Sequence, residues 1–193
     1  MDLNQQDGAG CTPLHVAVSS NLVELVAPLL RMKASTEVQA DDGSTALRLA
    51  VAQGDLTLTQ ALLQVGADKN ALGADAAPLI VLAAATSVPV ATALVMAGAD
   101  LNQTDGAGRT ALEVAVSRGE AELCELLLTK GAKPTNRRDA HGNTSLHVAV
   151  MRGEEGIVRL LVRHKAELSE QNRKGETPLI IGAEGGQGEA ALG

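Results

Sequence analysis

Apolar residues along the chain occur in pairs of short runs, separated by polar stretches rich in Gly, Asp and Asn. In residues 105–134, the first run starts at Leu112 and ends before Gly119, and the second starts at Leu123 and ends before Gly131. The apolar residues of the second run recur at the intervals of one face of an amphipathic helix. Glycine is the residue best suited to the left-handed backbone that follows a helix. The pattern therefore predicts two short helices joined by a tight turn and followed by an extended loop.

This two-helix pattern recurs along the whole chain. Its first helices are predicted in TPLHVAVSS, TALRLAVAQG, APLIVLAAAT, TALEVAVSRG, TSLHVAVMRG and TPLIIGAEGG, which begin at Thr12, Thr45, Ala77, Thr110, Thr144 and Thr177. These starts are 33, 32, 33, 34 and 33 residues apart. A repeat of this size cannot bury its own apolar face and must stack on its neighbours. We expect a single all-α array over residues 1–193, with repeats of about 7–39, 40–71, 72–104, 105–138, 139–171 and a partial repeat, 172–193.

The repeats resemble the ankyrin repeat, in which Asp and Gly precede Thr-Pro-Leu-His and Gly-Ala-Asp follows the second helix. The segments that carry the resemblance are DGAGCTPLHVAV from Asp7, LLQVGADKN from Leu62, VMAGADLN from Val95 and DAHGNTSLHVAV from Asp139. The resemblance implies an ankyrin-repeat solenoid of stacked antiparallel helix pairs with β-hairpin-like loops. It also implies a non-enzymatic scaffold for protein–protein interaction that binds its partner on a concave surface of loop tips and first helices.

Such arrays serve several kinds of protein, and a fold alone does not choose among them. The alternative is a recognition array excised from a larger enzyme, ubiquitin-ligase adaptor or channel whose activity lies outside this chain. The opening MDLNQQDGAGCT matches ADLNQTDGAGRT at Ala99, so we expect an excerpt of a longer array or a truncated product.

The third repeat and two prolines depart from the pattern. The third repeat lacks the Asp, the first Gly, the Thr and the His, which predicts a weaker cap and loop. Pro89 is expected to begin a second helix, where a missing amide hydrogen is harmless. Pro28 falls inside a predicted helix, where proline removes a hydrogen bond, so we expect a bend or early fraying there.

Composition excludes several functions. Phe, Tyr and Trp are all absent, although single-stranded nucleic acids stack on aromatic rings and methylated lysine is bound in aromatic cages. The net charge of −7 also disfavours nucleic acid, which needs a basic surface. The apolar stretch 76–85 is shorter than the roughly 20 residues that cross a bilayer, so no membrane insertion is expected. Cys11 and Cys124 lie far apart in the sequence and lack the spacing of a zinc or redox site, which fits a reducing compartment. We therefore expect a cytoplasmic protein, with the nucleus as the alternative.

No residue pattern indicates an enzyme, a cofactor or a metal site. His15 and His147 occupy the TPLH position, whose imidazole bonds neighbouring loops in the family that the chain resembles. His141 and His164 have no Cys or His at metal-ligand spacing. Cys124 lies on an apolar stripe and is expected to be buried.

The resemblance implies partner-binding positions at loop tips and on first helices. Those we expect to contact a partner are Asp41, Asp42, Gln53, Arg109, Arg118, Arg137, His141, Met151, Arg152, Arg173 and Lys174. Residues 1–100 hold 4 Lys or Arg and 10 Asp or Glu, whereas residues 101–193 hold 12 and 13. We therefore expect a monomer that binds another protein through an acidic, extended segment across repeats four to six, with a solvated charged face as the alternative. Asn70 and Asn102 resemble asparagines that are hydroxylated in some ankyrin repeats, which is a third, separate possibility.

Overall fold

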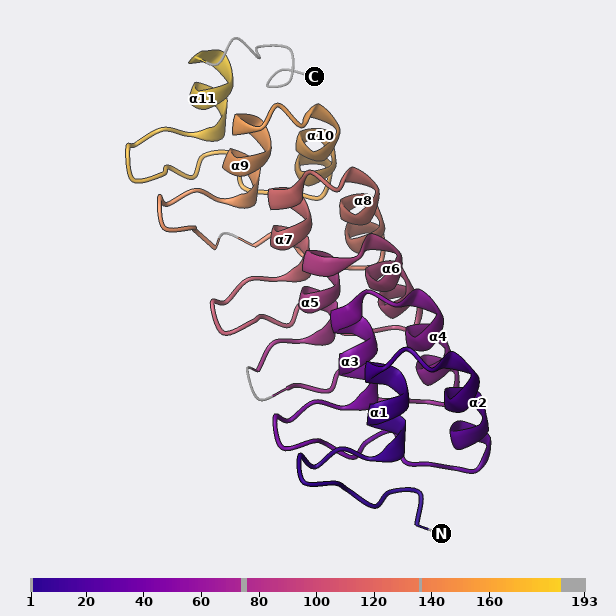
Figure 1. Cartoon of the computed structure of the whole chain (residues 1–193). Coiled ribbons are helices and arrows are strands. Elements are labelled where there is room, and N and C mark those ends of the chain that lie inside the picture. Colours follow the sequence, from indigo (N-terminus) through magenta and orange to yellow (C-terminus); the bar gives the residue numbers. More distant parts are fainter. Residues whose placement is uncertain (1, 74–75, 136, 185–193) are drawn as a thin grey trace. The chain divides into compact units, whose positions relative to one another are not determined.

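The structure, a computed structural model, describes residues 2–73, 76–135 and 137–184. Its helices are α1 (Pro13–Ser19), α2 (Val23–Arg31), α3 (Ala46–Gln53), α4 (Leu56–Gln64), α5 (Leu79–Thr86), α6 (Val88–Met96), α7 (Ala111–Arg118), α8 (Ala121–Thr129), α9 (Ser145–Met151), α10 (Glu155–Arg163) and α11 (Pro178–Glu184) (Figure 1). Within the described residues the only strand-like pairing is an isolated antiparallel bridge between Leu72 and Pro78. The expected all-α class is confirmed.

The helices fall into two compact parts, which we name the N-terminal half (Met1–Gly108) and the C-terminal half (Arg109–Gly193). In the N-terminal half α1, α3 and α5 form one row and α2, α4 and α6 another (Figure 1). In the C-terminal half α9 packs between α7 and α11, and α8 packs against α10. Each half is thus a stack of helix pairs, while a single array and its repeat boundaries stay predictions.

The predicted apolar stripes form the core of each half. On α8, Leu123, Cys124 and Leu127 are at most 1% exposed. The equivalent leucines of α4, Leu58 and Leu62, are fully buried. Removing each such side chain from water contributes on the order of 1.5–3 kcal/mol, which compensates for helices of only two or three turns.

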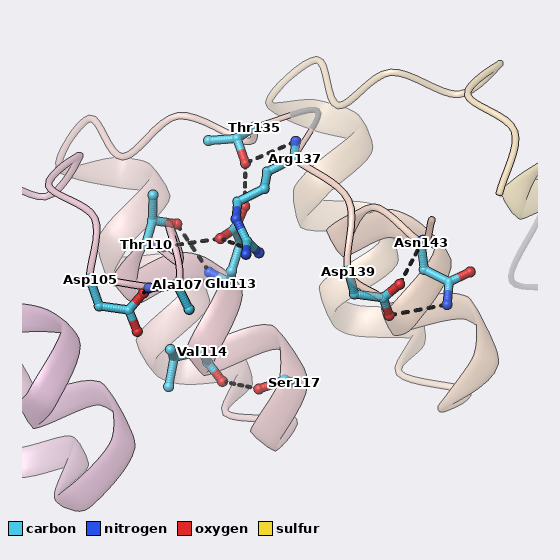
Figure 2. Close-up of polar contacts among 10 residues, drawn as sticks. All are labelled: Asp105, Ala107, Thr110, Glu113, Val114, Ser117, Thr135, Arg137, Asp139 and Asn143. Carbon is cyan, nitrogen blue, oxygen red and sulfur yellow. Dashed lines mark hydrogen bonds and ion pairs between the residues drawn. The ribbon is translucent and has the colours of Figure 1, made fainter. Parts of the chain in front are cut away.

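Helix ends follow the expected local chemistry. The Thr110 hydroxyl caps α7 by accepting a hydrogen bond from the Glu113 amide, and the Glu113 carboxylate accepts one from the Thr110 amide in return (Figure 2). This reciprocal pair satisfies two amides that a helix N-terminus leaves open. At the other end, Gly119 has a φ of 76° and closes α7.

The structure also tests the expectations for the third repeat and the two prolines. In the third repeat α5 begins at Leu79, and its N-cap, Pro78, makes no side-chain cap hydrogen bond. Pro89 lies in the first turn of α6, as predicted. The early fraying expected at Pro28 was wrong, since α2 continues to Arg31, while a bend there stays a prediction. Burial of Val26, which is 1% exposed, holds that helix in place where propensity alone would end it.

Candidate protein-binding site

Two buried histidines each join a loop to the next helix pair. His15 Nδ1 accepts a hydrogen bond from the Thr12 amide at 3.2 Å, which leaves the proton on Nε2. Nε2 then donates to the carbonyl oxygen of Ser44 at 3.0 Å. His147 makes the equivalent bond to Glu176 at 3.1 Å. Both imidazoles are buried, so the predicted structural role of these histidines is confirmed.

The C-terminal half contains a hollow of about 510 Å³ between two loops and α9. We name it the α9 groove; its lining includes Ser117, His141, Met151, Arg152, Arg173 and Lys174. Five of the residues predicted from sequence to bind a partner therefore lie together. Met151 is 48% exposed and Val148 also lines the groove, so the wall includes apolar surface.

The two loops of the α9 groove are held in close contact. The Arg173 amide donates to the carbonyl oxygen of His141 at 3.0 Å. Gly142, with a φ of 82°, lies so close that a Cβ atom there would be 2.7 Å from the Arg173 nitrogen. Any other residue at position 142 would separate the loops, so glycine maintains the shape of the groove.

The carboxylates of the α9 groove accept hydrogen bonds from residues of their own loops. Asp139 accepts hydrogen bonds from the Asn143 amide at 2.8 Å and from Asn143 Nδ2 at 3.1 Å (Figure 2). It also accepts one from the His141 amide at 2.8 Å. Burial works to raise the pKa of Asp139, but these bonds outweigh it and the pKa is lowered. Glu176 accepts from Asn172 Nδ2 at 2.9 Å. The acids of the groove are thus turned toward the protein itself.

The cations of the α9 groove are more available. Within the described part of the chain, the side chains of Arg173 and Lys174 form no hydrogen bond or ion pair, and both residues are exposed. Arg152 pairs with Glu154 at 3.6 Å, and its side chain is 42% exposed. Such surface pairs contribute little and are easily exchanged. The groove therefore presents positive charge without an equal number of free acids.

Arg118 lies at the end of α7, beside the groove residue Ser117. It repeats the arrangement of Arg152, because each Arg is followed by Gly and then by the Glu with which it pairs at 3.6 Å. Arg152 also approaches the earlier turn, since a Cβ atom on Gly119 would be 3.0 Å from its Nη2. The two arginines thus extend the positive surface along the C-terminal ends of α7 and α9.

Arg137 and Arg109 do not line the groove. Arg137 lies 3.8 Å from Glu113, whose side chain is 11% exposed and also accepts from the Thr135 hydroxyl (Figure 2). Arg137 is therefore engaged within the fourth repeat. Arg109 is exposed on the loop before α7.

Of the predicted residues in the N-terminal half, Asp41 and Asp42 lie together and Gln53 lies elsewhere. Asp41 and Asp42 line a second hollow, of about 440 Å³, together with Cys11. The Ser44 amide donates to Asp42 at 2.8 Å, which lowers the pKa of Asp42. Gln53 donates instead to the carbonyl oxygen of Ser19 at 3.0 Å, which links α3 to the end of α1.

The described residues were also compared with the requirements of a metal site and of a reactive thiol. They contain no group of His, Cys, Asp and Glu that could hold a metal ion. Burial raises the pKa of the Cys124 thiol to about 12, which removes its nucleophilicity.

Asn70 accepts a hydrogen bond from the Asp100 amide at 2.9 Å, and modification of Asn70 or Asn102 stays a prediction. None of the helices described is long and apolar enough to span a bilayer.

We did not single out three structural residues, Asn172, Arg48 and Glu113, from the sequence pattern. Asn172 stands where Asp139 stands in the repeat before, three residues ahead of a Gly, and accepts from the Lys174 and Glu176 amides at 2.9 and 3.0 Å. That shared position was a readable signal. Arg48 and Glu113 occupy the histidine position of their repeats, but their partners could not be inferred from the pattern.

The comparisons with known proteins agree with this geometry. The model described as ankyrin repeats (3 copies) matches residues 1–73 and 135–192, and the one described as ankyrin repeat matches residues 107–140. The chain belongs to the ankyrin repeat family. Its residues align with the solved ankyrin repeat domain of Bcl-3, a member of the IkappaB protein family, at 31% identity and a TM-score of 0.80, covering 99% of this chain and 86% of that one. Ankyrin repeats are protein-interaction modules, and the fold is not itself catalytic.

Two curated relatives contain the same repeats in larger proteins. The Nuclear factor NF-kappa-B p105 subunit of Gallus gallus is 31% identical over 134 residues, which cover 67% of this chain and 14% of that protein. The L-asparaginase of Dirofilaria immitis is 32% identical over 138 residues, which cover 69% of this chain and 23% of that protein. The ankyrin chain thus spans less than a quarter of either relative.

Proposed function

We propose that this ankyrin chain is a non-enzymatic protein-binding module whose binding surface in the C-terminal half is the α9 groove with Arg118 beside it. The observation that supports this most is the imbalance of available charge. Asp139 and Glu176 are occupied by Asn143 and Asn172, whereas Arg173 and Lys174 carry side chains with no partner among the described residues. A partner that supplies carboxylates would complete this surface.

The proposed partner is another protein that presents an acidic, extended segment across repeats four to six. Arginine and carboxylate form bidentate, charge-assisted hydrogen bonds, and Arg is enriched among residues that dominate binding energy. Met151, exposed on the same groove, would receive an apolar side chain of that segment. Nucleic acid fits less well, because the chain has a net charge of −7 and no aromatic residue.

We also propose a cellular compartment for this binding activity. The thiols of Cys11 and Cys124 are free, which suits the cytoplasm or the nucleus. Because the relatives are several times longer than this chain, the same surface would serve equally as the capture element of a larger protein.

The test measures binding of a fluorescent peptide of alternating Glu and Leu residues to the purified chain. Reversing Arg118 and Arg152 to Glu together is expected to weaken binding by tenfold or more, since about 1.4 kcal/mol is tenfold in affinity. The control reverses Arg163 and Lys165, which gives the same change in net charge on α10 and the residues after it, away from the groove. Equal affinity of the Arg118 and Arg152 variant and the unaltered chain would refute the proposed surface.

A further inference from the structure

Asn172 directly precedes Arg173 and Lys174, the two groove cations whose side chains have no partner in the described part of the chain. Its Oδ1 accepts hydrogen bonds from the amides of Lys174 and Glu176, at 2.9 and 3.0 Å. Its Nδ2 donates to Glu176 Oε2 at 2.9 Å and to Asn143 Oδ1 at 3.1 Å. An amide side chain has two lone pairs and two hydrogens, so every hydrogen-bonding site of Asn172 is used. The orientation of this amide is therefore fixed.

The bond to Asn143 crosses from one loop of the α9 groove to the other. Asn143 lies in the loop before α9, is 6% exposed, and donates through its own Nδ2 to Asp139 (Figure 2). The side chains of Asp139, Asn143 and Asn172 thus form a chain of hydrogen bonds between the two loops. The backbone joins the same loops, because the Arg173 amide donates to the carbonyl oxygen of His141.

The position of Asn172 carries an acid in the repeat before. Asp139 accepts from the amides two and four residues later, just as Asn172 does. An aspartate can fix its own loop in this way, but it has no hydrogen to donate to a neighbouring loop. At residue 172 it would also face the Glu176 carboxylate and the Asn143 oxygen. Closing the turn needs only an acceptor, so the amide is required for the link between the loops.

We propose that Asn172 is a positioning residue of the α9 groove, which holds the loop of Arg173 and Lys174 in place for the carboxylates of a partner. This inference rests on the function proposed above and adds the residue that sets the geometry of the groove. Ordering a loop on binding costs free energy, and a loop that is fixed beforehand avoids part of that cost. Asn172 acts through the two cations and needs no contact with the partner.

The experiment exchanges the acid and the amide of this loop. The exchange variant, Asn172→Asp with Glu176→Gln, leaves the net charge unchanged and reproduces the order of Asp139 and Asn143, so the loop can keep its own hydrogen bonds. It removes the donor to Asn143. Affinity for the fluorescent peptide of alternating Glu and Leu residues is expected to fall by about fivefold, the effect of one net hydrogen bond.

Two further measurements separate positioning from a general loss of structure. In an Arg173→Ala, Lys174→Ala background the same exchange should leave the remaining affinity unchanged, because no cation is left for the loop to position. An equal loss of affinity in both backgrounds would indicate a purely structural role and overturn the proposal. Without peptide, the Arg173 amide hydrogen should exchange faster in the exchange variant, and equal protection would show that the side-chain link does not hold the loops.

The matched control is Glu167→Gln with Gln171→Glu, which moves one charge by four residues in the same loop and changes no residue that lines the groove. It should bind the peptide as the unaltered chain does. If circular dichroism shows the exchange variant to be unfolded, Asn143→Ser replaces it. That change introduces the residue found before the N-cap of α3, Ser44, and removes the acceptor of the link.

The outcomes distinguish this inference from the proposed function. An exchange variant that binds the peptide as tightly as the unaltered chain overturns the role of Asn172 and leaves the binding surface standing. An unaltered chain that does not bind the peptide removes both.

Discussion

Nη1 of Arg48 donates a hydrogen bond to the carbonyl oxygen of Ala77 at 2.8 Å. Ala77 precedes the N-cap of α5, just as Ser44 precedes the N-cap of α3 and receives the equivalent bond from His15. Arginine thus does in the second repeat what histidine does in the first. The longer side chain needs room, which Gly73 provides: a Cβ atom there would lie 2.3 Å from Nε of Arg48.

Gly73→Ala is expected to destabilise the chain by about 1–3 kcal/mol, because the new methyl group displaces a buried guanidinium from its hydrogen bond. In an Arg48→His background the same change should have little effect, since the shorter imidazole leaves that space empty. Urea unfolding of the four proteins gives the coupling between the two sites. An equal penalty in both backgrounds would show that the collision with Arg48 is not the cause.

Glu113 stabilises the fourth repeat through its carboxylate. It accepts from the Thr110 amide at 3.0 Å and from the Thr135 hydroxyl, and Arg137 lies 3.8 Å away. Glu113→Ala should lower the free energy of unfolding by about 1–3 kcal/mol, because the Thr110 amide loses its partner. Glu113→Gln, which keeps an acceptor, should cost less. The exposed Glu125→Ala on α8 is the control and should change stability by less than about 0.5 kcal/mol.

Thr59 is a buried residue whose hydroxyl has no hydrogen-bond partner in the described structure, although its side chain is 0% exposed. The equivalent residues of α2 and α10 are Val26 and Val158. Thr59→Val keeps the shape and removes the unsatisfied group, so we expect a gain of about 1–3 kcal/mol. Thermal unfolding measures it, and a lower melting temperature would contradict the prediction.

Acid should weaken the loops through Asp139, Asp42 and Asp7, whose pKa values are all lowered from 3.8 in the folded chain. The folded state therefore binds fewer protons than the unfolded state near that pH. The stability from these carboxylates is present above the unfolded pKa and is lost as pH falls through it toward the lower folded pKa. Asp139→Asn should be less stable at neutral pH and should lose less stability on acidification. Urea midpoints between neutral and acid pH test this, and identical profiles would refute it.

The differences between sequence and structure arise where a distant contact outweighs a local preference. The N-cap, the glycine stop and the apolar stripe of α7 and α8 are local, and they could be predicted. The continuation of α2 through Pro28 could not, because it depends on burial of Val26 against neighbouring helices. The start of α5 at Leu79 is one residue later in its motif than the starts of α1 and α3, and the third repeat lacks the threonine that marks this position in the other repeats.

The proposed binding site divides in the same way. Position in the repeat predicted His141, Met151, Arg152, Arg173 and Lys174 as neighbours, and the α9 groove brings them together. Position could not reveal that Arg137 is paired with Glu113, since that pair joins a loop to a helix more than twenty residues earlier.

By itself, the sequence determined the helix pairs, their period and the family, because caps, turns and apolar stripes act within a single repeat. Only the tertiary structure decided which charged side chains are satisfied internally and which apolar faces stay uncovered. Both depend on what the neighbouring repeat supplies. Leu25 and Leu58 occupy the same place in the pattern, yet one is half-exposed and the other fully buried.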